Sequence, residues 1–224
     1  MNRWTSAHPV WNAVALVHLL AYLYLAYLAR VTGPLAIDHS VREFFRTSQH
    51  TTLGWMLKKW AVFGDWQMLS VGLICLSLFF SPEVRRRFLL FFLLALGGGG
   101  LVGQLTKMVV GRMRPRDARL GFPSGHTIAA MITVCGLLYF GARSGVLRRP
   151  VAWGLSAGTD ALIVLGVGVS RMYTDSHWLT DVFGGIMLGV AVSTGVAAAF
   201  EGRVAARQPM ADQRCQGGSV CGGE

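Results

Sequence analysis

Charged residues are scarce in this chain. Asp, Glu, Lys and Arg make up 14% of its 224 residues, against 53% hydrophobic residues, whereas roughly a quarter of the residues in a soluble domain are charged. This shortage argues against a soluble globular protein. Acidic residues are the scarcest, with 11 against 21 Lys and Arg, and the net charge is +10. Because no RNA-binding signature or zinc-finger spacing accompanies this charge, we expect the cations to bind anionic lipid headgroups and phosphate, with no nucleic-acid partner.

Cysteines are also few, and the four present form no CxxC pair. Cys75 and Cys135 lie inside apolar runs, where a thiol usually packs as a small hydrophobic group. Cys215 and Cys221 lie in a polar, Gly-rich tail, where a disulfide or a metal site is the minor alternative. We therefore expect no disulfide framework.

Long apolar runs occupy most of the chain. Six stretches come close to the roughly 20 mostly apolar residues that one membrane-spanning helix needs. They are continuous and rich in Leu, Val and Ala, unlike the short alternating segments of a membrane β-barrel. The sequence therefore predicts an all-α integral membrane protein with six transmembrane helices, in one domain over residues 1–207. The predicted helices are 11–28, 61–80, 88–106, 127–142, 151–169 and 179–200.

The two ends of the chain carry different signals. The first apolar run is longer than the core of a secretory signal and lacks a convincing small-residue cleavage site, so we expect it to be a retained helix. Residues 208–224 are polar and Gly-rich without an apolar period, which predicts a disordered tail.

The segment 33–60, between the first two predicted helices, is amphipathic. Val41, Phe44 and Phe45 fall at helical spacing among charged residues, and Trp60 follows a pair of lysines. This pattern predicts an interfacial segment lying in the headgroup layer. A solvated loop with Trp anchors is the alternative.

Two glycine pairs and one acid stand out inside the apolar runs. Gly99 with Gly103, and Gly185 with Gly189, have the small-xxx-small spacing of closely packed membrane helices. Packing is the expected role, with a flexible hinge as the alternative. Asp160 lies within the fifth run, where both a functional role and a position near the membrane surface are open.

A first phosphate-binding motif ends the third run. Lys107 and Arg114 are seven residues apart, so both project from one face if the helix continues that far, before Pro115 stops it. Two cations on one face suit a phosphate dianion, since the planar fork of Arg pairs with two oxygens at once. Alone, these residues would more often be snorkelling anchors.

A second motif, Pro123-Ser124-Gly125-His126, opens the fourth run. The start of a helix presents unpaired backbone N–H groups to an anion. Ser124 can cap the helix or donate to phosphate, and Gly125 lets an oxygen approach the backbone. His126 would stand in the first turn, beside a bound phosphate. Alone, the tetrapeptide is an ordinary capped helix start.

A third motif joins the last two runs. Ser170 and Arg171 end the fifth run, and His177 and Asp181 begin the sixth. A spacing of four places His177 and Asp181 on one helical face, within hydrogen-bonding reach. A carboxylate on one ring nitrogen fixes the tautomer and leaves the other nitrogen free to attack. Because further ligands at matching spacing are missing, we expect neither a metal nor another cofactor.

The positions of the cations predict the orientation. With the N-terminus cytoplasmic, ten Lys and Arg fall inside and eleven outside, but six of those eleven lie in or beside the three motifs. Without those six, ten Lys and Arg lie inside and five outside. This excess of cations favours cytoplasmic termini and motifs facing the exterior. The six are Lys107, Arg112, Arg114, Arg116, Arg119 and Arg171.

Together the motifs read K-x6-RP, PSGH and SR-x5-H-x3-D over residues 107–181. This pattern resembles the signature of the type 2 phosphatidic acid phosphatase superfamily, in its integral-membrane lipid phosphatase branch, with every specified position matched. The resemblance implies that His177 attacks phosphorus to form a phosphohistidine, supported by Asp181. It implies that His126 first protonates the leaving oxygen and then activates water. The phosphate would be held by Lys107, Arg114, Ser124, Gly125 and Arg171.

The resemblance further implies a metal-independent lipid phosphatase at the outer face of a bacterial-type plasma membrane. Candidate substrates are phosphatidylglycerophosphate, undecaprenyl diphosphate, phosphatidic acid and the 1-phosphate of lipid A. Arg112, Arg116 and Arg119 lie outside the signature and would read the headgroup or raise the local potential. Two alternatives stay open: transfer of the phosphoryl group to another lipid, and a non-enzymatic transporter. The oligomeric state is left open.

Overall fold

The computed structural model describes residues 8–47, 52–144 and 150–217. In these ranges every regular element is helical, and paired extended backbone is limited to one bridge between Met113 and Leu120. The all-helical prediction is therefore confirmed. The elements are α1 (His8–Val31), α2 (Ala36–Arg46), α3 (Thr52–Trp60), η1 (Ala61–Gly64), α4 (Trp66–Ser77), α5 (Pro82–Val110), α6 (Gly125–Ser144), α7 (Pro150–Tyr173) and α8 (Leu179–Gly217).

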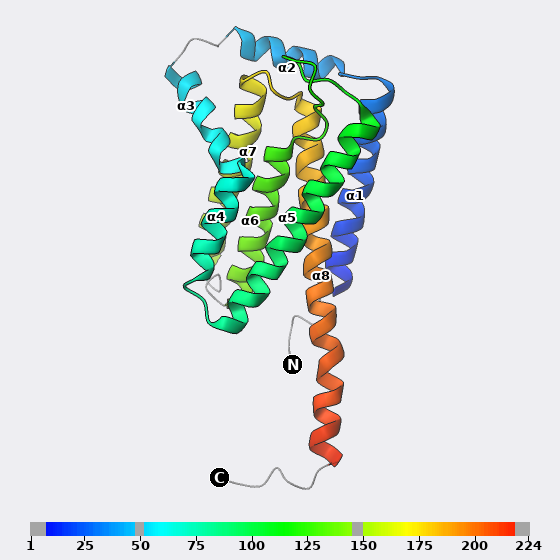
Figure 1. Ribbon diagram of the computed structural model, residues 1–224, viewed down its shortest axis with the longest axis vertical. Helices are drawn as coiled ribbons and strands as arrows, with labels where there is room; N and C mark the ends of the chain where they lie inside the picture. Colours follow the sequence, from blue (N-terminus) through cyan, green and yellow to red (C-terminus); the bar gives the residue numbers. More distant parts are fainter. Residues whose placement is uncertain (1–7, 48–51, 145–149, 218–224) are drawn as a thin grey trace.

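The long helices form a bundle around α6 and α8 (Figure 1). Helix α8 packs against α1 and α6, and α6 also packs against α5 and α7. Helix α2 lies across one end of this bundle. The α5–α6 and α7–α8 loops, which carry the three motifs, lie at that same end (Figure 1).

The opposite half of the bundle is held by aromatic packing. Phe88 and Phe91 of α5 are fully buried, and Phe91 stacks on Tyr139 of α6 at 5.4 Å between ring centroids. Phe88 contacts Phe140 of α6 at 5.1 Å. Each buried aromatic ring removes a large apolar area from its surroundings and limits sliding. This packing fixes α5 against α6, and with it the positions of their motif-bearing ends.

The described helices include several of membrane-spanning length. By length and composition, four qualify among the described residues: Pro9–Val31, Pro82–Val110, Gly125–Ser144 and Leu179–Gly202. A bent pair, Gly54–Gly64 with Trp66–Ser77, would make a fifth. All six predicted stretches fall on helices, but the number of spans supported by these criteria is four or five.

The second predicted stretch, 61–80, is not one straight helix. It begins in η1, breaks at Asp65 and resumes as α4, with a bend of 59°. The Asp65 carboxylate accepts hydrogen bonds from the backbone N–H groups of Gln67 and Met68, which makes Asp65 an N-cap that starts a new helix. The Gly64-Asp65 pair was the sequence signal for this break.

The predicted amphipathic segment forms α2 and α3, but the buried face of α2 is polar. Asp38 is buried and Arg42 half-buried, one turn apart, whereas Phe44 is 67% exposed. The face of α2 that carries Asp38 and Arg42 is therefore turned toward the bundle, and Phe44, one of the predicted apolar positions, lies on the exposed side. Residues 48–51 of this segment lie outside the described residues.

The glycine pairs pack as predicted. A Cβ at Gly99 or Gly103 would meet Ile128 on α6 at 3.2 Å or 3.0 Å, and a Cβ at Gly189 would meet Met131 at 2.6 Å. Close approach of α5 and α8 to α6 therefore depends on these small residues. The side chain of Asp160 lies outside the described residues.

Helix α8 extends to Gly217, ten residues past the predicted domain end at 207. This extension differs from the tail that we predicted for 208–224. Ala, Arg, Gln and Met within residues 205–216 favour a helix, whereas Pro209 opposes one, so helix propensity alone does not explain the extension. The side chain of Cys215 and the whole of Cys221 lie outside the described residues.

Candidate active site

Backbone hydrogen bonds bring the three motifs together at the α2 end of the bundle. The N–H of Ser124 donates to the carbonyl of Asp181 at 3.0 Å, which joins the start of α6 to the start of α8. The N–H of His177 donates to the carbonyl of Arg171 at 3.2 Å. The second and third motifs therefore form one unit, although more than 40 residues of chain separate them.

The first motif does not lie on one helix face. Helix α5 ends at Val110, and Gly111 adopts a left-handed conformation with φ of 68°. Its N–H closes the helix on the carbonyl of Lys107, a common C-terminal arrangement that favours glycine. Lys107 and Arg114 therefore do not share one helix face, contrary to the prediction, and Gly111 was the sequence signal against it.

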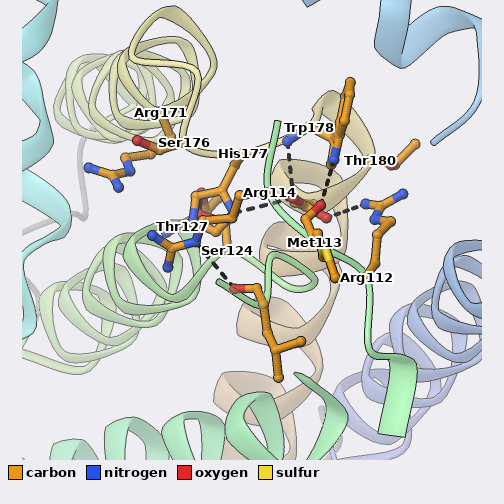
Figure 2. A network of polar contacts seen from close by, with 12 residues as sticks. Arg112, Met113, Arg114, Ser124, Thr127, Arg171, Ser176, His177, Trp178 and Thr180 are labelled. Atoms are coloured by element: carbon orange, nitrogen blue, oxygen red, sulfur yellow. Dashed lines mark hydrogen bonds and ion pairs between the residues drawn. The ribbon is translucent and has the colours of Figure 1, made fainter. Parts of the chain in front are cut away.

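Arg114 instead belongs to a short hairpin in the α5–α6 loop. Its N–H donates to the carbonyl of Arg119 at 2.9 Å, and its Nε donates to the carbonyl of Leu120 at 3.2 Å. Figure 2 shows Arg114 and Arg171 on one side of the His177 ring and Arg112 on the other. Burial lowers the pKa of Arg114, and the neighbouring Arg119 lowers it further. A bound anion would relieve this crowding of cations.

The second motif starts α6 as predicted. Ser124 is fully buried, and its hydroxyl accepts hydrogen bonds from the N–H and the hydroxyl of Thr127 at 3.5 Å and 2.9 Å. Gly125 is exposed, and a Cβ there would lie 3.9 Å from the Lys107 ammonium nitrogen. Lys107 thus reaches the helix start from α5. His126 is half-buried in the first turn of α6.

The predicted hydrogen bond between His177 and Asp181 is present, with 3.3 Å between Nδ1 and Oδ2. Helix α8 begins only at Leu179, so His177 precedes the helix rather than sharing its face. Asp181 Oδ2 also accepts the N–H of Trp178 at 3.0 Å, as an acid in the first turn of a helix often does. With Nδ1 engaged, Nε2 is the nitrogen available for attack.

Burial favours the neutral form of His177. The side chain is 1% exposed, and burial lowers the pKa of His177 below its ordinary value, against the opposing effect of Asp181. Arg114 and Arg171 add to the lowering. A neutral imidazole keeps the lone pair that a nucleophile needs.

Sequence reasoning misjudged Arg112 and missed Asp38. The Arg112 side chain is 3% exposed and donates through Nη2 to Asp181 Oδ1, so it is paired inside the protein. Its Nη1 lies 3.6 Å from Asp38 Oδ2, on α2. These contacts join residues 69 and 74 positions apart, and no local pattern signals them.

The other two cations outside the signature lie at the surface. Arg119 pairs with Asp117 at 2.5 Å between Nη2 and Oδ2, and this hydrogen bond holds the pKa of Asp117 well below its usual range. Arg116 lies 3.6 Å from the same carboxylate and donates to the carbonyl of Thr174 at 3.5 Å. Both cations therefore share one acidic partner.

Across the residues that the structure describes, no group of three His, Cys, Asp or Glu side chains is arranged to hold a metal ion. What surrounds the histidines instead is cationic: Lys107, Arg114 and Arg171 come from three different segments. This arrangement suits a bound phosphate group.

A family comparison decides how these motifs are classified. The model of the PAP2 superfamily matches residues 88–205, more than half of the chain and all three motifs. This chain belongs to the PAP2 superfamily. The resemblance stated from the motifs is thereby confirmed.

Two known proteins are similar to this chain. It is 30% identical over 109 residues to phosphatidylglycerophosphatase B of Bacillus subtilis (strain 168), a match that covers 45% of this chain and 52% of that protein. The chain thus matches about half the length of this curated relative. A crystal structure, described as the first transmembrane PAP2 type phosphatidylglycerolphosphate phosphatase from Bacillus subtilis, has the same fold, with a TM-score of 0.73. The sequence identity is 23%, over 85% of this chain and 96% of that one.

Proposed function

We propose that this protein is a membrane lipid phosphatase that works through a phosphohistidine on His177. The observation that carries the proposal is the buried His177–Asp181 pair, whose remaining ring nitrogen is free. Three cations from separate segments surround it. A nucleophile with a fixed tautomer beside an anion-binding cradle is what phosphoryl transfer requires.

In the first step, Nε2 of His177 attacks the phosphorus of the lipid phosphate. The bond from phosphorus to the lipid oxygen breaks, and His126 gives its proton to that oxygen. Asp181 accepts the Nδ1 hydrogen of His177 and stabilises the positive charge that the ring gains. The products are a dephosphorylated lipid and a phosphohistidine.

In the second step, His126 is neutral and removes a proton from water. The oxygen of that water attacks phosphorus, and the bond from phosphorus to His177 breaks. Inorganic phosphate leaves, and His126 has regained the proton that it lost. Both steps therefore balance without a further reactant.

The phosphate oxygens are held by positive groups throughout. Lys107, Arg114 and Arg171 supply charge, and the N-terminus of α6 at Ser124 and Gly125 supplies backbone N–H groups. In many phosphoryl-transfer enzymes Mg²⁺ offsets the charge that develops in the transition state. We propose that these three cations do so here, and that the reaction needs no metal.

The proposal includes the membrane setting. We infer six spans, with α7 and the bent α3–α4 pair completing the four that length and composition support, and α2 in the headgroup layer. The charge distribution favours an exterior-facing site in a bacterial-type plasma membrane. The name of the curated relative makes phosphatidylglycerophosphate the first substrate to test.

The test is phosphate release by the purified protein in detergent with EDTA, across a panel of lipid phosphates and diphosphates. His177→Ala should abolish release, and His18→Ala is the matched control, because His18 lies on α1 and bonds only within that helix. Free phosphate from one lipid, lost only in His177→Ala, supports the proposal. Release that survives in His177→Ala, or that EDTA abolishes, contradicts it. Product analysis separates hydrolysis from transfer, since transfer yields a new phospholipid and no free phosphate.

A further inference from the structure

Helix α2 carries a buried carboxylate that the proposed reaction does not use. The Asp38 side chain is fully buried. It accepts hydrogen bonds from the N–H and the hydroxyl of Thr180, at 2.9 Å and 2.8 Å, and from the N–H of Leu35 at 2.9 Å. Each of these three groups is a donor, which is the environment of an ionised carboxylate.

Asp38 is connected to the proposed nucleophile through Arg112. The two terminal nitrogens of Arg112 are divided between the two carboxylates: Nη1 faces Asp38 at 3.6 Å, and Nη2 donates to Asp181. Asp181 in turn bonds Nδ1 of His177. The chain of contacts therefore runs from α2, through the α5–α6 loop, to the start of α8.

The charges in this cluster explain why two carboxylates are present. Arg112 alone would neutralise Asp181, and His177 would then face no net negative charge. With Asp38 present, the cluster of Asp38, Arg112 and Asp181 carries a net charge of −1. All three side chains are at most 3% exposed, so water screens this charge only weakly.

We propose that Asp38 is a positioning residue for the proposed nucleophile: it holds Arg112 and the start of α8 so that a net negative charge stays behind the His177–Asp181 pair. That charge stabilises the positive ring of the phosphohistidine as it forms. The inference rests on the proposed function and adds to it a residue outside the superfamily motifs. It also gives α2 a role in the reaction.

A purely structural role for Asp38 predicts something different. Asp38 also anchors α2 to the bundle, as Arg42 does through Asp175, at 2.8 Å, and through the carbonyl of Pro115. If anchoring were the whole role, Arg42→Gln would reproduce the effect of Asp38→Asn. If charge is the role, Arg42→Gln should leave the rate of phosphohistidine formation within about threefold.

The experiment measures phosphohistidine formation in a single turnover, by acid quench with a phosphorus-labelled lipid, in wild type and variants. Asp38→Asn should slow formation about thirtyfold, the effect of one unit charge several ångströms away in a protein interior. KM should change little, because the phosphate-binding cations are untouched. Thr180→Val, which removes one bond to Asp38 and no charge, should slow formation less than threefold.

The decisive comparison is the double variant Asp38→Asn/Arg112→Gln, which restores the net charge of −1. It should form phosphohistidine at least tenfold faster than Asp38→Asn alone. An Asp38→Asn rate within threefold of wild type, or a double variant no faster than the single one, overturns the inference. If Asp38→Asn does not fold, the double variant is compared with wild type: a loss within about threefold supports the inference and a larger loss overturns it. Wild type without phosphate release would instead refute the proposed function itself.

Discussion

The sharpest test of the proposed nucleophile is Asp181→Asn, because the amide nearly matches the carboxylate in shape. Asp181 Oδ2 accepts from His177 and from the N–H of Trp178, while Oδ1 accepts from Arg112. Both oxygens therefore act only as acceptors. An amide has one oxygen and one NH₂ group, so one of these two sets of donors must lose its acceptor.

The charged donor decides which way the amide turns. A hydrogen bond to a charged group contributes about 1.5–3 kcal/mol, against about 1 kcal/mol for a neutral one. The amide oxygen should therefore face Arg112, and its NH₂ should face His177 and Trp178. A donor against Nδ1 moves the His177 proton to Nε2, the nitrogen that must attack. The equivalent change in a Ser-His-Asp triad lowers kcat about 10⁴-fold through the wrong tautomer, and we expect a loss of that order here.

The assay is single-turnover phosphohistidine formation together with steady-state phosphate release. Glu83→Gln is the matched carboxylate-to-amide control, since Glu83 is exposed at the start of α5, away from the motif end. Binding of inorganic phosphate should survive in Asp181→Asn, because the three cations remain. An Asp181→Asn protein that keeps more than a tenth of wild-type activity would refute the tautomer argument.

Because burial lowers the pKa of His177, its ring should lose its proton at a lower pH than an ordinary imidazole does. As the pH falls, phosphohistidine formation should therefore drop to half its maximal rate only below about pH 6.5, the ordinary value for histidine, and a midpoint at or above that pH would contradict this. In Gly121→Ala the new Cβ would meet Asp181 Oδ2 at 2.9 Å. Displacing that carboxylate should lower kcat by up to about 100-fold, with little change in KM. An unchanged kcat would show that the α5–α6 loop moves and the carboxylate does not. Asp65→Ala removes the α4 N-cap and should lower the free energy of unfolding by about 1 kcal/mol, which corresponds to a fall in Tm of about 2–4 °C. An unchanged Tm in a thermal melt would show that the cap does not stabilise the protein.

The sequence predicted those features that leave local signals. The apolar runs predicted the positions of the long helices, except for the break at Asp65, and the three motifs predicted the residues that meet at one end of the bundle. Ser124 accepts the N–H of Thr127 at the start of α6, and His177 bonds Asp181, as their positions in the motifs indicated. These features depend on neighbours within a few residues, so the pattern of the chain carries them.

The missed features depend on contacts between distant residues. Asp38 meets Thr180 across 142 positions, and an acid in an amphipathic helix normally faces water. Arg112 was expected to read the headgroup or to raise the local potential, because its two acidic partners lie on other segments. The ends of α5 at Gly111 and of η1 at Asp65 do have local signals, namely a glycine and a capping acid. The long apolar runs beside these residues favoured continuous helices in the prediction.

The bond between the Ser124 N–H and the Asp181 carbonyl has a consequence for motion. It ties the first turns of α6 and α8 together, so we expect the proposed acid–base His126 and the proposed nucleophile His177 to keep a nearly constant separation. Opening of the site to a lipid must then come from other parts of the same end, namely α2 and the hairpin that carries Arg114. We expect hydrogen exchange at that end to be slowest in the first turns of α6 and α8 and faster in the hairpin.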